Sequence, residues 1–190
     1  MRGAVIYGLG DVRFEELPEP KIVEPFDAIV RIAATTICGS DLWTYRGIIP
    51  VIKPIPFGHE YCGVVEEVGR EVTSIKPGQF VIGSFFASDN TCPNCRNGFQ
   101  TSCVRRTQMF GCQAEAVRVP MADGALVAIP ERPAPEQVPS MLALSDVMGT
   151  GWFAAVAANV TPGMTVAVVG DGAVGLCGVL AAAQPTGSSR

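Results

Sequence analysis

Residues 58–72 read GHEYCGVVEEVGREV, and this segment joins a strand pattern to the one histidine of the chain. The β-branched and apolar side chains of residues 61–68 predict a short strand. His59 and Glu60 stand directly before it, where a strand begins. A lone histidine is more often a structural residue than a ligand, so the segment indicates a metal site only in company with other ligands.

Similar short strands are expected throughout the first half of the chain. Turn-forming residues separate them, as in PEP at 18–20, KPG at 76–78 and MADG at 121–124. Several short strands punctuated in this way predict a barrel or a sandwich. The expected strands cover residues 3–7, 12–17, 28–36, 61–68, 80–85, 116–119 and 126–129.

The pattern changes after Pro130. Residues 133–136, PAPE, indicate the start of a helix, and residues 141–146 and 152–159 are expected to be helical. Residues 165–169 predict a strand, which leads into the glycine-rich segment 170–175 and then a helix from Ala173. A strand, a glycine loop and a helix in this order open a dinucleotide-binding unit. The alternative is a tight turn that binds nothing.

Composition narrows the class of protein. The net charge of -4 and the scattered basic residues argue against a nucleic-acid surface. The longest apolar stretch, residues 173–183, is about half of the ~20 residues that a membrane span needs. No signal peptide is recognisable at the first residues, so a cytoplasmic protein without membrane contact is expected. Seven cysteines, an odd number, fit a disulfide framework poorly and favour metal binding.

Three separate segments carry candidate ligands for a catalytic metal. They are Cys38 with residues 39–41, His59 with Glu60, and Asp146 with its neighbours. A catalytic zinc ion takes three protein ligands of nitrogen, sulfur or oxygen type and keeps one position open. Thiolate, imidazole and carboxylate meet that need, although each residue alone has an ordinary structural interpretation.

These segments resemble the zinc-dependent alcohol dehydrogenases of the medium-chain dehydrogenase/reductase superfamily. The spacing GHE-x2-G-x5-G-x2-V from Gly58, the CGSD segment from Cys38 and the DVMGTGW segment from Asp146 are similar to the family's motifs. The resemblance covers residues 1–183. It implies a mainly β, GroES-like zinc-binding catalytic domain over residues 1–147, followed over residues 148–190 by the start of an incomplete NAD(P)-binding Rossmann domain.

The resemblance implies that Cys38, His59 and Asp146 hold the catalytic zinc. Family members have Cys or Asp at the place of Asp146. Glu60 sits beside the site, either as an occasional or as a permanent ligand.

The same resemblance implies roles for residues around the metal. Asp41 would orient His59, with a local helix cap as the alternative. The Ser40 hydroxyl would accept the substrate proton. Trp43 replaces a histidine that often finishes this relay, which leaves the path to water or makes Trp43 a pocket wall. Phe85 is expected either in the pocket wall or in the core.

A second group of ligands follows the spacing Asp-x2-Cys-x2-Cys-x7-Cys. It comprises Asp89, Cys92, Cys95 and Cys103 in a lobe spanning residues 89–103. Many family members have four cysteines here around a structural zinc, and an aspartate oxygen is an acceptable ligand. The lobe is therefore expected to bind zinc. The alternative is a loop that has lost its metal and keeps three free thiols.

The nucleotide site implied by the resemblance lies at the glycine loop. Gly170, Gly172, Ala173, Val174 and Gly175 would bind the pyrophosphate through backbone N–H groups and the helix N-terminus. The acid that reads the ribose should follow by ~20 residues, beyond the last residue of the chain. The cofactor is accordingly expected to be NAD or NADP, and the chain to be truncated.

The leading hypothesis is a zinc-dependent oxidoreductase that transfers hydride between an alcohol or carbonyl substrate and NAD(P), in a truncated chain lacking full activity. A homo-oligomer is one possibility for a full-length form, and the sequence leaves the oligomeric state open. The alternative is a non-catalytic zinc-binding barrel fragment or an interaction subunit. A zinc-free quinone-reductase relative is a third hypothesis, and the candidate ligands argue against it.

Overall fold

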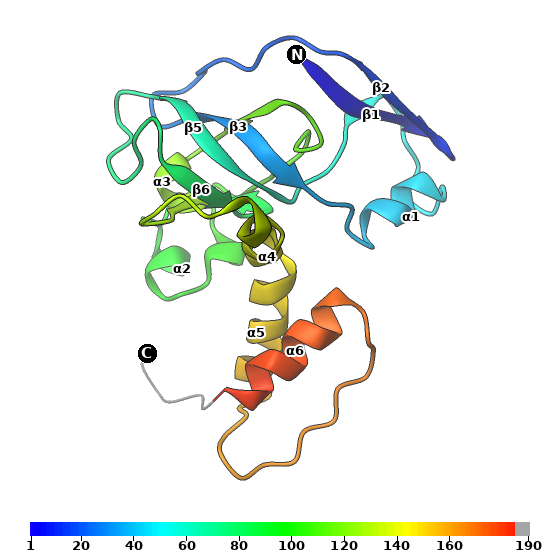
Figure 1. The fold of residues 1–190 in the computed structure, drawn as a ribbon, viewed down its shortest axis with the longest axis vertical. Coiled ribbons are helices and arrows are strands. Elements are labelled where there is room, and N and C mark those ends of the chain that lie inside the picture. The colour runs from blue at the N-terminus through cyan, green and yellow to red at the C-terminus, as the bar shows by residue number, and fades with distance from the viewer. Residues whose placement is uncertain (185–190) are drawn as a thin grey trace. The chain divides into compact units, whose positions relative to one another are not determined.

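The computed structural model describes residues 1–184, and the chain divides into two units. The first unit is Met1–Leu142, and the second begins at Ala143. The first unit contains all ten strands of the described chain. Figure 1 labels the larger of these strands.

A five-stranded antiparallel sheet forms the larger part of the first unit. Its order is β10 (Leu126–Ala128), β6 (Phe80–Gly83), β5 (Tyr61–Val68), β3 (Ala28–Thr35) and β9 (Ala116–Val119). A three-stranded sheet has the order β2 (Asp11–Glu16), β1 (Arg2–Gly8) and β4 (Ile55–Pro56). The short strands β7 (Phe86–Ala87) and β8 (Thr107–Gln108) form a separate pair.

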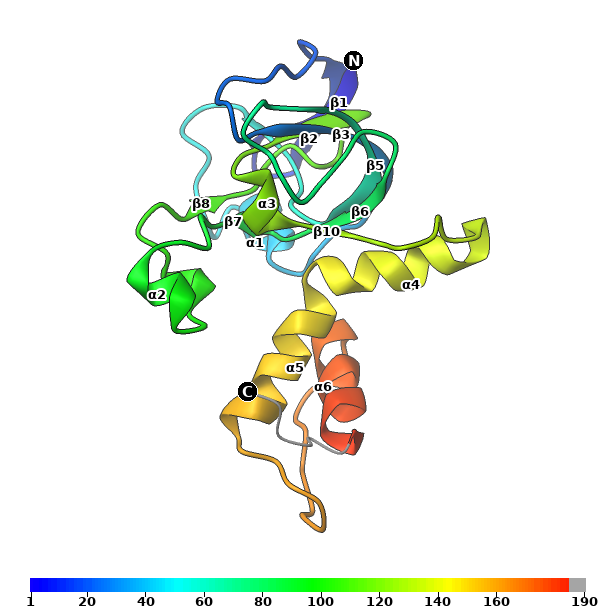
Figure 2. The ribbon, with the colours of Figure 1, turned by 90° about the vertical axis from the view of Figure 1, so that its left-hand side faces the viewer.

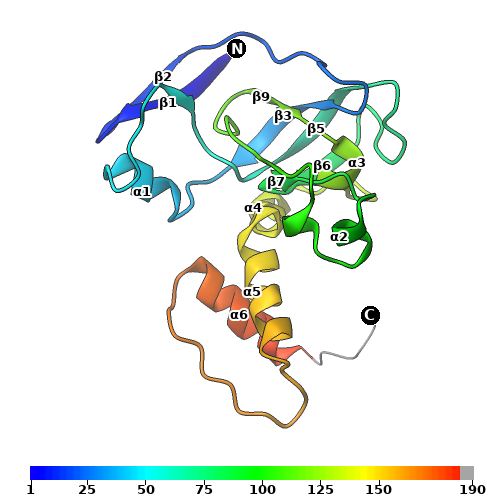
Figure 3. The same cartoon turned by 180° about the vertical axis from the view of Figure 1, so that it is seen from behind.

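Backbone hydrogen bonds join the two larger sheets. The N–H of Ala4 donates to the carbonyl of Gln113 over 2.8 Å, and that of Glu115 donates to Arg2 over 3.0 Å. The N–H of Ile32 in turn donates to Glu115 over 3.0 Å. The segment before β9 therefore bonds to β1 on one side and to β3 on the other, as Figure 3 lets the reader follow.

The alternation of apolar residues places one face of the sheets in a common core. Val30, Val65, Val81 and Val119 are completely or almost completely buried there. A second, smaller cluster forms where helix α4 (Val138–Leu142) packs on β3 and β5 through Leu142. The mainly β class expected from the sequence is confirmed.

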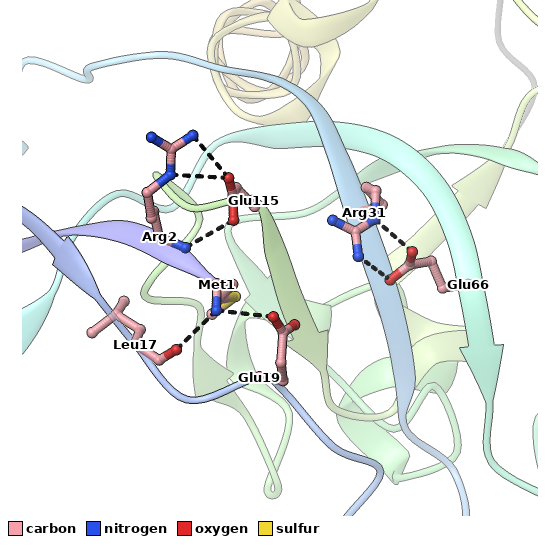
Figure 4. A network of polar contacts seen from close by, with 7 residues as sticks. All are labelled: Met1, Arg2, Leu17, Glu19, Arg31, Glu66 and Glu115. Carbon is pink, nitrogen blue, oxygen red and sulfur yellow. Dashed lines mark hydrogen bonds and ion pairs between the residues drawn. The ribbon is translucent and has the colours of Figure 1, made fainter.

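Exposed ion pairs lie along the outer side of the strands. The side chains of Arg2–Glu115 and Arg31–Glu66 keep much of their surface in solvent, so these two pairs contribute little to stability. They connect strand edges that are distant in sequence. Figure 4 shows the three pairs Met1–Glu19, Arg2–Glu115 and Arg31–Glu66.

Two glycines of the GHE segment are required where backbones approach closely. A Cβ atom on Gly63 would lie 2.1 Å from the carbonyl oxygen of Arg31 on the neighbouring strand. A Cβ atom on Gly69 would lie 2.2 Å from the carbonyl oxygen of Pro25. The register of β3 on β5 shifts beside Gly63, between Ile32 and Ala34. Both glycines therefore serve the pairing of β3 with β5.

Most predicted strands are confirmed, but two local predictions in the first unit are wrong. The expected strand 80–85 ends at Gly83, and Phe86 instead pairs with Gln108 of β8. The expected turn 121–124 contains a one-turn helix, α3 (Ala122–Ala125). The carboxylate of Asp123 accepts hydrogen bonds from both the backbone and the hydroxyls of Thr73 and Ser74, which holds this turn against the neighbouring loop.

Short helices occupy the connections of the first unit. The helix start expected at 133–136 is the 3₁₀ turn η2 (Pro135–Gln137), which runs into α4. The others are α1 (Asp41–Tyr45), α2 (Pro93–Arg96) and the 3₁₀ turn η1 (Gln100–Ser102).

The second unit is a helix pair. It contains the 3₁₀ turn η3 (Ala143–Ser145), α5 (Val147–Ala157) and α6 (Ala173–Ala183). The two long helices lie side by side because small residues face each other: a Cβ atom on Gly151 would lie 2.6 Å from the backbone nitrogen of Gly178 (Figure 1). The helix expected at 152–159 thus begins earlier, at Val147.

The strand expected over residues 165–169 is not formed. Its backbone has no strand assignment, and Val169 is fully exposed. A strand needs a partner for its N–H and C=O groups, and the described part of the second unit has no other strand. The helix expected from Ala173 is confirmed as α6.

In residues 1–184, no single helix has the length and apolar composition to cross a membrane. A broken pair, Pro135–Ser145 and Val147–Ala157, meets the test by length and composition, as core helices of globular proteins also do.

Replacing Gly63 by alanine tests the close pairing of β3 and β5. The added methyl group must push the strands apart, so the free energy of unfolding should fall by about 1–3 kcal/mol. Gly8→Ala is the matched control, because nothing lies within 4 Å of a Cβ there. Chemical denaturation of both variants measures the difference, and equal stabilities would contradict the close approach.

Candidate metal centres

The first group of candidate ligands lies at one end of the β3–β5 pair. Thr35 at the end of β3 pairs with Tyr61 at the start of β5. Cys38 follows β3 and His59 and Glu60 precede β5, so the antiparallel pairing brings them together. One ligand atom of each lies within 4.8 Å of those of the others. His59 and Glu60 are buried and Cys38 is half-buried.

The carboxylate of Asp41 contacts two of these residues. Its Oδ1 lies 3.1 Å from Nδ1 of His59, and its Oδ2 accepts the N–H of Cys38 over 2.9 Å. With Nδ1 directed at Asp41, the other ring nitrogen is the one that can bind a metal. Asp41 is itself only 8% exposed. A single buried carboxylate therefore orients both the thiol segment and the imidazole.

The turn that carries His59 is held by a segment that the sequence did not indicate. Gly58 has a left-handed φ of 85°, and its Cβ would lie 2.5 Å from the side chain of Gln113. The carbonyl of Gly58 accepts the N–H of Cys112 over 3.1 Å, and that of Phe57 accepts the N–H of Gln113 over 2.9 Å. No local pattern could have revealed this contact, because it joins parts of the chain far apart in sequence.

Ser40, Trp43 and Phe85 differ in how close they lie to the candidate ligands Cys38 and His59. Ser40 is exposed at the start of α1, and its side chain makes no capping hydrogen bond. The ring of Phe85 stands edge-on to His59, with the ring centres 6.5 Å apart. Trp43 is 56% exposed on α1. Phe85 therefore contacts a candidate ligand, whereas Ser40 and Trp43 lie on the adjoining surface.

Asp146 lies in the second unit, directly before α5. Its Oδ1 accepts the hydroxyl of Thr150 over 2.8 Å, and its carbonyl accepts the N–H of Thr150 over 2.9 Å. These contacts hold the aspartate at the first turn of the helix.

The second group of candidate ligands is complete within the first unit. One ligand atom each of Asp89, Cys92, Cys95 and Cys103 lies within 4.8 Å of the others. The lobe is formed by α2, η1 and their loops, which Figure 2 shows projecting from the strands. The three cysteines pack against one another and are buried.

Asp89 is held ready as a charged ligand. Its Oδ1 accepts the N–H groups of Thr91 over 2.9 Å and of Cys92 over 3.0 Å. These two backbone hydrogen bonds hold the pKa of the Asp89 carboxyl well below its usual range. A carboxyl group whose pKa is lowered in this way is charged at neutral pH, and the charged form is the one that binds a metal.

The sulfur atoms of the lobe have the spacing of a zinc site. All seven cysteines of the chain are free, and the sulfurs of Cys92 and Cys95 lie 3.5 Å apart. Tetrahedral zinc–sulfur bonds of ~2.3 Å place two sulfurs roughly 3.8 Å apart. Burial raises the pKa of Cys95 to about 12, whereas backbone N–H groups of Cys95 and Val104 lower that of Cys92. Three thiols and a carboxylate fit a closed, four-coordinate zinc site.

The glycine loop of the second unit makes a tight entry into α6. Gly170 has a φ of 111°, and a Cβ on Gly175 would lie 2.0 Å from the carbonyl oxygen of Gly170. Gly172 caps the helix, and Ala173 and Val174 are its first residues. The loop therefore folds back closely on the first turn of α6, whose N–H groups suit an anion.

Comparison with known proteins matches the first unit to a domain family. The model of the alcohol dehydrogenase GroES-like domain matches residues 24–131. A protein of Mycobacterium tuberculosis described as a probable zinc-binding alcohol dehydrogenase is 38% identical over 188 residues, covering 96% of this chain and 48% of that protein. The chain spans about half the length of the curated relatives it matches.

Solved structures extend the similarity to the fold. Alcohol dehydrogenase TADH from Thermus sp. ATN1 superposes with a TM-score of 0.85 at 35% identity, over 96% of this chain and 54% of that one. A zinc-binding dehydrogenase structure from Sinorhizobium meliloti, solved with NADP bound, has a TM-score of 0.73 at 30% identity, over 97% of this chain and 54% of that one. The first unit is thus a GroES-like domain, and the second corresponds to part of a Rossmann domain. With its domain match, its relatives and its structural neighbours in agreement, the chain belongs to the zinc-dependent alcohol dehydrogenases of the medium-chain dehydrogenase/reductase superfamily.

Proposed function

We propose that this chain carries the catalytic zinc centre of an oxidoreductase that transfers hydride between an alcohol or carbonyl substrate and NAD or NADP. The observation that carries the proposal is the arrangement of Cys38, His59 and Asp41. A thiol and an imidazole lie within metal-binding distance of each other, and the imidazole has its second nitrogen directed at a buried carboxylate. Ligands oriented in this way are characteristic of metal centres.

Cys38 and His59 are proposed as two of the zinc ligands, and Asp146 as the third. The chemistry of the set supports this assignment, because sulfur, nitrogen and oxygen ligands together leave zinc one open position. Glu60, buried beside His59 with a carboxylate oxygen within 4.8 Å of the ligand atoms of Cys38 and His59, would be able to approach the metal. Bound zinc supplies a Lewis acid that polarises the substrate oxygen and lowers the pKa of its hydroxyl group.

The protein's own residues then have to bind the substrate and move one proton. The Ser40 hydroxyl is proposed to accept the proton of the alcohol, because it is exposed beside Cys38 and makes no capping bond. Asp41 keeps the imidazole of His59 in one tautomer. Phe85 supports the same ring from its edge and offers an apolar wall to the substrate. Since His59 is the only histidine of these 190 residues, the proton leaves Ser40 through water.

The glycine loop is proposed to bind the cofactor pyrophosphate. Gly170, Gly172, Ala173, Val174 and Gly175 form a tight turn at the start of an 11-residue helix, where backbone N–H groups and the helix dipole attract anions. The NADP bound to the Sinorhizobium meliloti protein supports a nicotinamide dinucleotide as the ligand class. The lobe of Asp89, Cys92, Cys95 and Cys103 is proposed to bind a second, structural zinc.

Metal analysis tests both zinc assignments. The purified chain should contain about two zinc ions, and Cys38→Ser should reduce this to about one by removing a catalytic-site ligand. Cys62→Ser is the matched control, because Cys62 is a fully buried core residue outside both groups. Atomic emission measures the stoichiometry. An unchanged zinc content in Cys38→Ser would sink the ligand assignment.

Replacing Asp41 by asparagine tests the orientation of His59. The amide is similar in size but has no charge, so zinc affinity at this centre should fall by roughly 10–100-fold. Competition with a chromophoric chelator measures the affinity, and Asp11→Asn serves as a control because the Asp11 carboxylate pairs with the exposed Arg13 and belongs to neither group of candidate ligands. Equal affinities in the two variants would show that Asp41 has no part in metal binding.

Turnover is the test of the reaction itself. The zinc-loaded protein should reduce NAD or NADP in the presence of an alcohol, but more slowly than full-length relatives, because the chain spans about half of their length. Cys38→Ser and Asp146→Ala should abolish the reduction, and Cys62→Ser should retain it. Absorbance of the reduced nicotinamide measures the rate. Zinc-loaded protein that neither binds nor reduces either cofactor would favour the alternative of a non-catalytic zinc-binding fragment.

A further inference from the structure

Two thiols of the cysteine lobe contact each other directly. The sulfurs of Cys92 and Cys95 lie 3.5 Å apart, and the remaining approach to a disulfide bond of ~2.05 Å is about 1.5 Å. Both residues belong to one helical turn, because Cys92 caps α2 and Cys95 lies within it. Side-chain rotation can therefore close the bond without moving a distant part of the chain.

The third thiol, Cys103, lies in the same cluster, with its sulfur within 4.8 Å of those of Cys92 and Cys95, but it has other hydrogen-bond partners. The sulfur of Cys103 accepts the N–H of Asp89 over 3.4 Å and that of Arg105 over 3.3 Å. Cys103 follows η1, so it does not belong to the helical turn that carries Cys92 and Cys95. The fourth position is occupied by Asp89, whose carboxylate cannot form a bond to sulfur. Cys92 and Cys95 are therefore the pair that side-chain rotation within one helical turn can join.

The lobe's dithiol also differs from the other buried thiols of the first unit. Cys62 and Cys112 are fully buried, and each is the one cysteine in its hydrophobic cluster. Cys92 retains 8% of its surface at the edge of a lobe that carries exposed side chains such as Phe99 and Val104. Cys95 is 4% exposed whereas Cys62 and Cys112 are 0% exposed, so among these four thiols only the pair in the lobe presents surface to a small oxidant.

We propose that Cys92 and Cys95 are a modification site at which a hydroperoxide forms a disulfide when the lobe lacks zinc, and that bound zinc protects them. This inference rests on the zinc site proposed for the lobe, but it does not depend on the catalytic centre. The disulfide removes two of the four ligands, so oxidised protein cannot rebind zinc until a thiol reductant restores them. Zinc occupancy of the lobe would then depend on the redox conditions.

The chemistry balances with the peroxide as the only oxidant. The sulfur of one cysteine attacks the peroxide, the O–O bond breaks, and an alcohol or water molecule leaves with a proton. The resulting sulfenic acid is attacked by the second sulfur, its S–O bond breaks, and water leaves. Two thiols lose two electrons and two protons in total, and the hydroperoxide is reduced to an alcohol and water.

The test exposes two samples of the chain to a limited amount of hydrogen peroxide, one stripped of metal by a chelator and one loaded with zinc. Peptide mapping by mass spectrometry identifies the linked cysteines, and zinc content is measured on both samples beforehand. We expect a Cys92–Cys95 link in the stripped sample, formed at least ~10-fold faster than in the loaded sample. Cys62 and Cys112 serve as internal controls and should remain thiols.

A second variant separates pairing from folding. Cys103→Ser keeps the dithiol and should still form the link, with circular dichroism confirming that the strands are intact. Three outcomes would each overturn the proposal. They are links to Cys103 in the unmodified chain, oxidation to sulfinic acid without any link, and equal rates of link formation in a sample whose lobe holds zinc. Failure of the catalytic assignment has a different signature, because zinc loss in Cys38→Ser and alcohol-dependent turnover do not involve this lobe.

Discussion

The antiparallel pairing of β3 with β5 is the constraint on which the first unit depends. It places the residue that follows one strand beside the residue that precedes the other, since Thr35 pairs with Tyr61. Cys38 and His59 become neighbours for that reason, although 20 residues separate them in sequence. The pairing requires a glycine at position 63, where the Arg31 carbonyl leaves no room for a Cβ atom. Core packing and candidate chemistry are thus set by the same backbone contact.

Asp41 converts this proximity into a defined geometry. Its two oxygen atoms face Cys38 and His59, and it is almost fully buried. Burying a carboxylate is costly unless hydrogen bonds compensate, and here both oxygens are used. A metal bound to Cys38 and His59 would therefore meet ligands that are already oriented. That preorganisation is the physical reason for interpreting the cluster as a functional site.

The two candidate metal centres differ in how they are built. The lobe of Asp89 takes all its ligands from 15 consecutive residues, so short turns and one helical turn suffice to assemble it. The centre of Cys38 takes its ligands from the ends of different elements. Four protein ligands close the coordination of a structural zinc, whereas a catalytic zinc keeps one position open for water or substrate. Both centres use sulfur and oxygen ligands, and they differ in whether a local turn or the pairing of distant strands brings the ligands together.

The amino-acid sequence alone determined the strands, the motif spacings and the candidate ligands, because apolar alternation and ligand spacing are local properties. Local pattern placed the ends of strands less accurately than their centres. The expected strand at 165–169 did not form, because a strand needs a neighbouring strand as hydrogen-bonding partner and a local sequence pattern does not show whether one is present. Only the tertiary structure showed that Asp41 contacts both His59 and Cys38, and that the segment around Gln113 holds the turn at Gly58. It also showed that Phe85 stands against His59. These contacts join residues distant in sequence, and the packing of the whole sheet decides which of them meet.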